Sequence, residues 1–392
     1  MLTLAHQNLA VSVEFVRHPT DVPDSLWAAC FPPPLEGRFW YETLERSHLE
    51  DQFAFSYALI RREGQPVGLA PCFLHDVPIT LVAPPAVAWV LNQLARAIPR
   101  VGYQRTFFIG SPCSDEGTIG LVPGVTLAEI APALALAVRA QARELGARMI
   151  VFKDFPAADA TVLENMPHAG EFVSTLSYPG CVVPLPPPDK AAYYQSLTHG
   201  HRHNLLKKLR RSREALALDT QVLASPSDAE LAEIGALFQQ TYARGKTKFE
   251  RLGPEFFAQI RTHREASFVV QRETATGAMV AFMLVFRLGD RVINKFIGLD
   301  YARAGKTFLY FRLFDAAVDF AYAAGAGELQ SGQTGYRAKF DLGHRLVPLH
   351  NVFRHENPLI HVIFRTIGRR ITWTSLDPDL VGHDRADRTS GA

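Results

Sequence analysis

The hydrophobic and polar positions along the chain predict strands and helices that alternate in two successive series. In the first series the pattern favours strands at Val11–Val16, Phe53–Arg62 and Pro66–Leu74. A long Ala- and Leu-rich helix follows over Leu127–Leu145, and Gly146 ends it. The other elements predicted here are helices at Asp24–Cys30 and Phe39–His48 and strands at Thr106–Ile109 and Met149–Phe152.

The second half of the chain repeats this order of elements. Its predicted strands are Leu218–Leu223, Ala266–Glu273, Ala278–Leu288, Arg291–Leu299 and Glu328–Ser331. A helix capped by Asp189 is predicted to run to about Thr198, and a basic helix resumes after His199-Gly200 and runs to about Ala217. The other predicted helices are Ala229–Ala243, Pro254–Thr262 and Thr307–Ala324. Ser227 and Glu230 have the spacing of a capping box.

The repeated order predicts two similar α/β units in tandem. In each, an antiparallel run of strands precedes one long helix and a further strand. The Pro-rich stretch 184–188 is the best candidate for a boundary. The predicted division is a first unit over 1–183, a second over 184–372, and a polar tail over 373–392. The amphipathic, basic stretch 358–371 is expected to pack on the second unit, with contact to a membrane surface as the alternative.

Composition narrows the class of protein. With 392 residues, 47% hydrophobic and 20% charged, the chain is expected to be globular rather than disordered. Four widely spaced cysteines argue against a disulfide framework or a cysteine-rich zinc site. The longest apolar run, Val77–Ala95, contains three prolines, and no secretory signal pattern is recognised. We therefore expect a cytoplasmic protein without a transmembrane segment.

Charge is distributed unevenly along the chain. Residues 1–180 hold 12 Lys and Arg against 18 Asp and Glu, and residues 181–392 hold 29 against 21. A basic second half suggests an anionic ligand, such as a phosphorylated cofactor or RNA.

The segment from Asp300 to Thr307 resembles a phosphate-binding loop. Asp300 stands where the first glycine of a P-loop is needed, which argues against a nucleotide hydrolase. Arg303, Gly305 and Lys306 at the start of a helix would still offer N–H groups and positive charge to a pyrophosphate. The alternative is a surface turn with a basic rim.

The segment 199–213 carries six Lys and Arg and three His in 15 residues. Leu205, Leu206 and Leu209 form a narrow apolar stripe, so one helix face is expected to be buried and the other basic. That face would contact phosphate or RNA, or it is simply solvated. A metal site at the three histidines is not expected, because no acidic residue or Cys lies nearby.

A third polar segment, 330–343, follows the last predicted strand. Tyr336 and Lys339 stand three residues apart, on one face if the segment is helical. Tyr can donate a proton and Lys can neutralise an anion. The alternative is a packed loop that needs the glycines of this segment, Gly332, Gly335 and Gly343, for its turns. In the first half, Asp115-Glu116 and Lys153-Asp154 each follow a strand and either line a cleft or are solvated.

Five segments of the second half, in order, resemble the Fem-like group of GNAT-type N-acyltransferases associated with peptidoglycan biosynthesis. These are HRHNLLKKLRRSRE, YARGKTKFERLGPEFF, AMVAFMLVFRLGDRVINKFIGLD, FLYFRLFDAAVDFAYAAG and SGQTGYRAKFDLG. The resemblance covers about 189–354 directly and the first half through its order of elements. It implies a tandem α/β fold, each unit a mixed, mostly antiparallel sheet flanked by helices.

The resemblance also implies site residues, and we expect the second unit to carry the active site. Two central parallel strands would splay to admit an acyl thioester, with coenzyme A pyrophosphate at Arg303, Gly305, Lys306 and Thr307. A backbone N–H of the strand 293–299 would stabilise the oxyanion. The expected catalytic residues are Tyr336 as general acid, Asp300 as base or amine-binding carboxylate, and Lys339. The expected substrate-binding residues are Arg202, His203, Lys246, Gln333, Asp115 and Glu116.

Three functions follow as hypotheses. The first is a bacterial N-acyltransferase that uses an acyl-CoA, acetyl or another, and an amine acceptor such as a small molecule or a cell-wall precursor. The second is a Fem-like transferase that uses aminoacyl-tRNA, because Fem-type relatives lack the full pyrophosphate loop. The third is a non-catalytic scaffold. Neither a metal nor DNA is expected, and the sequence leaves the oligomeric state open.

Overall fold

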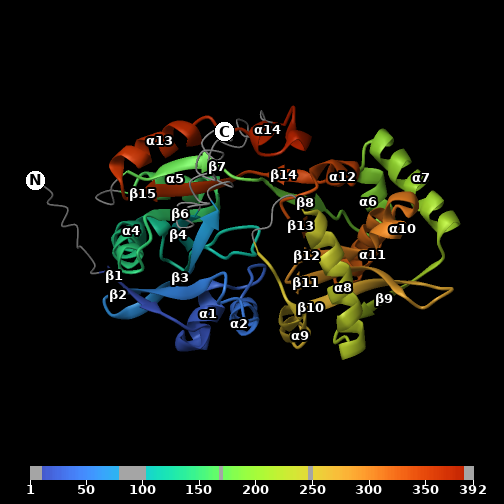
Figure 1. Ribbon diagram of the computed structural model, residues 1–392, viewed down its shortest axis with the longest axis horizontal. Coiled ribbons are helices and arrows are strands. Elements are labelled where there is room, and N and C mark those ends of the chain that lie inside the picture. Colours follow the sequence, from blue (N-terminus) through green and yellow to red (C-terminus); the bar gives the residue numbers. More distant parts are fainter. Residues whose placement is uncertain (1–10, 79–102, 167–170, 246–249, 384–392) are drawn as a thin grey trace, which may run out of the picture. The chain divides into compact units, whose positions relative to one another are not determined.

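The computed structural model describes residues 11–78, 103–166, 171–245 and 250–383 (Figure 1). The chain divides into two compact units, each with its own sheet. Unit 1 comprises Met1–Pro32, Leu49–Ser177 and Leu349–Thr372, and unit 2 comprises Pro33–His48, Tyr178–Pro348 and Trp373–Ala392. The apolar run in 79–95 lies outside the described residues.

Unit 1 is a mixed sheet with the strand order β1-β2-β3-β4-β6-β15-β7, and β5 pairs with β3. Its strands are β1 (Val11–Val16), β2 (Ala54–Arg62), β3 (Gln65–Pro78), β4 (Tyr103–Ile109), β5 (Gly120–Leu121), β6 (Met149–Pro156), β7 (Val173–Leu176) and β15 (Leu349–His355). Its helices are η1 (Pro19–Asp21), α1 (Asp24–Cys30), α4 (Leu127–Glu144), α5 (Ala157–Glu164) and α13 (Pro358–Gly368). β4 and β6 are the parallel neighbours, and the other pairs are antiparallel.

Unit 2 has the strand order β14-β8-β13-β12-β11-β10-β9. Its strands are β8 (Gly180–Pro184), β9 (Leu218–Leu223), β10 (Ala266–Glu273), β11 (Met279–Leu288), β12 (Arg291–Leu299), β13 (Glu328–Ser331) and β14 (Arg345–Val347). Its helices are α2 (Arg38–Arg46), α6 (Lys190–Ser196), α7 (His199–Ala215), α8 (Asp228–Arg244), α9 (Pro254–Ile260), α10 (Tyr301–Thr307), α11 (Leu309–Ala323), α12 (Tyr336–Asp341), α14 (Trp373–Leu376) and η4 (Pro378–Leu380). Here β12 and β13 are the parallel pair.

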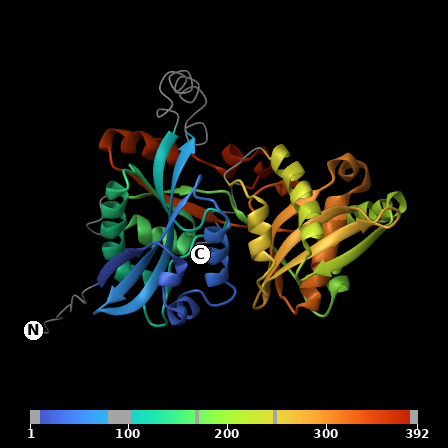
Figure 2. The same ribbon diagram turned by 60° about the horizontal axis from the view of Figure 1, so that its bottom comes forward.

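The central strand β11 shows why the sheet of unit 2 is covered on both faces. Ala281, Met283 and Val285 pack into the cluster that contains α7 and α11 residues. On the opposite face Phe282 contacts Phe257 of α9 edge to face. Alternate side chains of a strand point to opposite faces, so an unbroken apolar run is buried on both sides. Figure 2 shows the same sheet and helices from another direction.

The two units exchange strands. β8 directly follows β7 in the chain but pairs with β13 and β14 of unit 2. β15 directly follows β14 but lies between β6 and β7 of unit 1. The segment Pro33–His48 also belongs to unit 2, where Trp40 is fully buried and packs on Phe286. The sequence-based division at 183/184 and 372/373 does not anticipate this exchange.

Several expected elements are confirmed, and two expectations are wrong. The capping box of Ser227 and Glu230 begins α8, and Asp189 caps α6. The stretch that contains α13 packs on β7 and β15 of unit 1 rather than on unit 2. Residues 303–307 form part of α10 rather than a loop, because the Asp300 side chain accepts a hydrogen bond from the Ala302 N–H and caps a separate helix.

Two glycines of unit 2 give opposite predictions for stability. A Cβ at Gly298 of β12 would lie 2.3 Å from a Phe282 ring atom and 2.7 Å from the Leu237 carbonyl carbon. Gly298→Ala is therefore expected to destabilise unit 2 by about 1–3 kcal/mol through overpacking. Gly235 in α8 faces open space, so Gly235→Ala should stabilise it by about 0.5–1 kcal/mol. Urea unfolding measures both, and equal effects would contradict this packing.

Candidate active site

The parallel strands β12 and β13 part after four residue pairs, from Arg291 with Glu328 to Asn294 with Ser331. β13 ends there, whereas β12 continues to Leu299. The register of β12 against β11 shifts at this point, with Asn294 opposite Val285 and Phe296 opposite Leu284. Lys295 is the extra residue of this β-bulge, a feature that bends a strand and ends regular pairing.

The edge of β12 beyond the bulge has no strand opposite it among the described residues on the β13 side. The Asp300 N–H donates to Val280 of β11, whereas the Leu299 N–H donates to the Thr241 hydroxyl. Because successive residues of a strand direct their N–H groups to opposite edges, Ile297 faces the same way as Leu299. The Ile297 N–H therefore points to the side from which β13 has diverged.

A buried ion pair lies at the bulge. The Lys295 side chain is 2% exposed, and its ammonium lies 2.5 Å from the Glu36 carboxylate, itself 10% exposed. The same ammonium lies 4.5 Å from the centre of the Trp40 ring, a cation–π geometry. This group was not predicted from the sequence. Its only local signal is a lysine inside an otherwise apolar strand.

The end of β13 brings Tyr336 and Lys339 together, as expected for positions three apart on a helix. Gly335, at φ 69°, is the residue that precedes α12, and the Tyr336 and Lys339 side chains are both buried. The Lys339 ammonium lies 5.8 Å from the Tyr336 ring centre and donates to the Gly332 carbonyl. The Tyr336 hydroxyl donates to the Pro179 carbonyl at 3.0 Å. A buried cation beside a tyrosine is thus fixed at the end of the parallel pair.

His344 links this group to the strand, and it was not predicted from the sequence. Its Nδ1 lies 2.9 Å from the Lys339 carbonyl and its Nε2 lies 3.0 Å from the Ser331 hydroxyl. A carbonyl accepts only, so Nδ1 carries the proton and Nε2 accepts from Ser331. Burial, together with the Lys339 charge, lowers the pKa of His344 to about 3. The imidazole is therefore neutral at pH 7.

This burial of His344 predicts a pH-dependent stability. The native pKa lies below the ordinary value of about 6.5, so between these values the unfolded chain binds a proton that the native protein does not. The stabilisation is complete above pH 6.5 and is lost as pH falls toward 3, by up to about 1.4 kcal/mol per pH unit. His344→Gln should flatten this slope in urea unfolding between pH 4.5 and 7. An unchanged slope would contradict the assignment.

Asp300 and the expected coenzyme-binding residues lie apart from this group. Asp300 stands six residues beyond Asn294, roughly 20 Å along an extended strand, and its carboxylate accepts from the Ala302 N–H. Arg303 of α10 pairs with Asp300 and, at 3.3 Å, with Glu273. Gly305 and Thr307 lie in the same helix, with Gly305 exposed. The structure describes no side-chain position for Lys306, and Phe308, at φ 52°, separates α10 from α11.

The expected substrate-binding residues divide between the units. In unit 2 the Gln333 amide donates to the Tyr178 carbonyl at 2.9 Å. Arg202 is half-buried on α7, and the ring of the exposed His203 stacks on His199. Asp115 and Glu116 are half-buried in unit 1, after β4. Lys246 lies outside the described residues.

Unit 1 holds its own polar cluster where β4 and β6 part. Asp154 is buried at φ 60°, and its carboxylate accepts from Lys153 and Ser177. Its backbone N–H donates to Asn351 of β15 at 2.9 Å. Gly117 approaches so closely that a Cβ there would lie 2.0 Å from the Lys153 carbonyl oxygen. These hydrogen bonds use the polar groups of the cluster to join β6 and β15.

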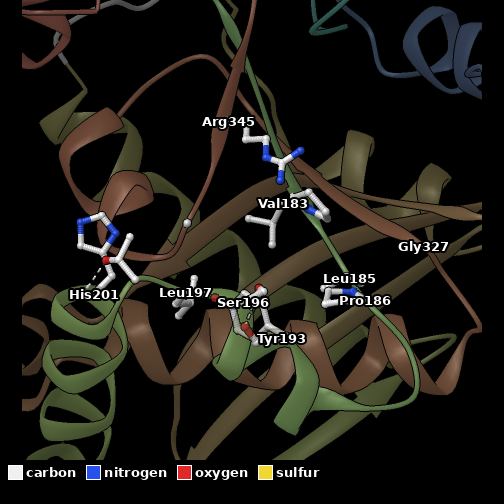
Figure 3. Close-up of a pocket in the computed structure, with 12 residues that line it drawn as sticks. Val183, Leu185, Pro186, Tyr193, Ser196, Leu197, His201, Gly327 and Arg345 are labelled. Atoms are coloured by element: carbon white, nitrogen blue, oxygen red, sulfur yellow. Dashed lines mark hydrogen bonds between the residues drawn. The ribbon is translucent and has the colours of Figure 1, made fainter.

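A pocket of about 430 Å³ opens in unit 2, away from the carboxyl end of β13 where Tyr336 and Lys339 lie (Figure 3). It is lined by Val183, Pro184, Leu185, Pro186, Tyr193, Ser196, Leu197, Thr198, His201, Gly327, Gly343 and Arg345. Gly327 precedes β13, so the pocket lies at the amino end of that strand. Tyr336, Lys339 and Asp300 do not line it.

The described part of the chain holds neither a cluster of metal ligands nor a helix suited to span a membrane. No group of three or more His, Cys, Asp or Glu within the described ranges is arranged to hold a metal ion. Among the helices that the structure describes, none combines the length and the apolar character needed to cross a membrane.

Comparison with solved structures shows that the chain has a fold similar to that of FemX. No family model and no curated protein sequence matches the chain. The solved structure of FemX is 14% identical, covers 90% of this chain and 100% of its own, and gives a TM-score of 0.55. A conserved protein of unknown function from Bacteroides thetaiotaomicron is 11% identical over 87% of this chain and 98% of its own, with a TM-score of 0.52. A tandem GNAT protein from the clavulanic acid biosynthesis pathway is 14% identical over 88% and 99%, with a TM-score of 0.49.

Proposed function

We propose, from a tandem GNAT-type fold of the kind that FemX has, that this chain is an N-acyltransferase with its active site in unit 2. The acyl group would move from the thioester of an acyl-CoA to an amine. The observation that supports this best is the divergence of β12 from β13 beside the buried pair Tyr336 and Lys339. Among the described residues, this divergence leaves one edge of β12 unpaired next to the Lys339 ammonium.

The reaction would proceed by direct attack of a neutral amine on the thioester carbonyl. The Ile297 N–H, on the open edge of β12, would donate to the carbonyl oxygen as negative charge develops there. The Lys339 ammonium would add a favourable field to the same region. The bond to sulfur then breaks, and the thiolate takes a proton from the Tyr336 hydroxyl, so that the free thiol leaves. The surplus proton on the acylated nitrogen passes through solvent to the Tyr336 phenolate, which yields the neutral amide and restores the hydroxyl. Because that hydroxyl donates to Pro179, it would have to change partner during the reaction.

Asp300 and Arg303 take structural roles in this proposal. Asp300 caps α10, and the Arg303 guanidinium is held by the carboxylates of Asp300 and Glu273. Hydrogen bonding to Asp300 raises the pKa of Arg303, which is charged in any case. A diphosphate would have to displace both carboxylates to reach this arginine. Lys306 and Thr307 remain the proposed contacts for the coenzyme, as the sequence suggested.

A second donor, an aminoacyl-tRNA, is favoured by one observation. Exposed basic residues form a stripe along α7, at His199, His203, Lys207, Arg210 and Arg211. Lys208 and Arg213 of the same helix have acidic partners, because Lys208 pairs with Asp341 at 2.5 Å and Arg213 lies 3.8 Å from Asp315. Within the stripe, Arg210 lies 3.9 Å from Glu214. A continuous exposed stripe suits a phosphate backbone. The basic stripe of α7 therefore keeps an aminoacyl-tRNA as the second candidate donor.

Titration calorimetry separates the donors. Acetyl-CoA and decanoyl-CoA are titrated into the wild type and Lys306→Ala, and unfractionated aminoacyl-tRNA into the wild type and Lys207→Gln/Arg211→Gln. Binding of an acyl-CoA that Lys306→Ala weakens would support the thioester. Binding of tRNA alone, weakened by the α7 variant and by salt, would support the second donor. Arg264→Gln, an exposed residue of the same unit, is the matched control. Binding of neither donor would contradict both.

A further inference from the structure

Helix α13 of unit 1 presents an apolar face to solvent. Its first two turns carry Leu359, Ile360, Val362 and Ile363, which are 77%, 37%, 47% and 58% exposed. These are four of the nine large hydrophobic side chains that the described residues expose. They gather on one helix rather than scattering, and a contiguous apolar patch of this kind marks an interaction surface.

The opposite face of α13 is anchored to unit 1. His361 and Gly368 are buried, and the Phe353 ring packs against His361 and Phe364. The Thr175 hydroxyl of β7 donates to the Gly368 carbonyl at 2.8 Å. Figure 1 shows α13 lying over β15 and β7. The helix is therefore held in place by one side while its other side stays uncovered.

The charged residues of the stretch 358–371 itself have one sign. The stretch 358–371 contains Arg365, Arg369 and Arg370 and no acidic residue. Arg365 pairs with Glu171 of unit 1, whereas Arg369 and Arg370 are exposed just past the last turn. Aliphatic residues on the outer face with arginines at the carboxyl end are the arrangement of a helix that lies in the interface of an anionic bilayer.

We propose that α13 docks this protein on the surface of an anionic lipid bilayer. Leu359, Val362 and Ile363 enter the boundary between headgroups and acyl chains, while Arg369 and Arg370 contact lipid phosphates. A second copy of the chain fits this face less well. Eleven residues of helix span about 16 Å, and such a face falls short of the roughly 800 Å² per partner that a stable dimer buries.

Vesicle flotation of the full chain tests the proposal. The probes are vesicles of phosphatidylcholine alone and of phosphatidylcholine with a quarter phosphatidylglycerol. The wild type should float with the anionic vesicles and less with the neutral ones, and added salt should weaken binding. Leu359→Ser/Ile363→Ser should weaken it about 100-fold. Arg369→Gln/Arg370→Gln should weaken it about 25-fold on anionic vesicles alone.

Leu206→Ser is the matched control, because Leu206 of α7 is also a large exposed hydrophobic, at 43%. All substituted side chains are exposed, so thermal melting should be unchanged. Wild-type protein that stays unbound, or a Leu359→Ser/Ile363→Ser variant that binds equally well, would overturn the proposal. A wild-type dimer in sedimentation analysis that this variant converts to monomer would also overturn it, and would assign the face to a second copy.

Discussion

Replacing Lys339 by methionine is expected to lower kcat for acyl transfer by about 100- to 1000-fold, the range found for removing one oxyanion-stabilising group. Lys339 is buried at the end of β13, beside the Tyr336 ring and the Gly332 carbonyl. Methionine keeps the length of the side chain and removes the charge. Single-turnover transfer to a panel of primary amines, with the donor that binds, measures the effect.

One control variant separates this charge effect from damage to the fold, and a second site variant tests the proton donor. Lys208→Met removes another ammonium of unit 2, whose side chain is 18% exposed and pairs with Asp341, and it should leave kcat within about twofold. Tyr336→Phe should also lower kcat if the hydroxyl protonates the thiolate. Full activity of Lys339→Met with an unchanged melting curve would contradict the proposed site. If Tyr336→Phe also had no effect, a non-catalytic scaffold would be supported.

The largest expected effect on stability belongs to Lys295 and Glu36. Lys295→Met is expected to destabilise unit 2 by about 3–5 kcal/mol, because it leaves the Glu36 carboxylate buried without its cation. The same change removes the cation–π contact with Trp40. Urea unfolding followed by Trp fluorescence should show an earlier transition of unit 2.

A double-mutant cycle makes this prediction specific. Lys295→Met/Glu36→Gln removes both charges and should recover a large part of the loss, since no uncompensated charge stays buried. Arg210→Gln breaks an exposed pair with Glu214, at 71% and 67% exposure, and should cost less than about 0.5 kcal/mol. Additive effects of the two single variants at Lys295 and Glu36 would rule out a coupled buried pair.

Local patterns predicted the elements well where local physics decides them. The strands at Val11–Val16, Leu218–Leu223 and Arg291–Leu299 have the expected bounds. Alternation and apolar runs report the two faces of a sheet directly. The start of α8 was predictable for the same reason, because Ser227 and Glu230 satisfy the helix end within four residues.

The exchange of strands was not predictable from these patterns. β8 and β15 each pair with strands far away along the chain. Their residues fit either sheet by periodicity alone, so only tertiary packing selects the partner. The segment with Trp40 is a similar case, because an amphipathic helix shows that it has a partner without showing which one.

The candidate site was predicted in part. The spacing of Tyr336 and Lys339 predicted that they share a helix face, which the structure confirms. The role of 303–307 as a loop was wrong, because the capping strength of Asp300 outweighs the single glycine at Gly305. His344 and Glu36 were missed because their burial depends on contacts with Ser331 and Lys295 that no local pattern encodes.

Hydrogen exchange of the full chain with and without donor tests the location of the site most directly. Acetyl-CoA, decanoyl-CoA and unfractionated aminoacyl-tRNA are the probes. We expect the donor that binds to slow exchange at residues 295–299 and 332–339 of unit 2, where β12 has parted from β13. Protection confined to residues 110–117 and 153–156, where β4 and β6 part in unit 1, would contradict the account, as would no protection with any of the three donors.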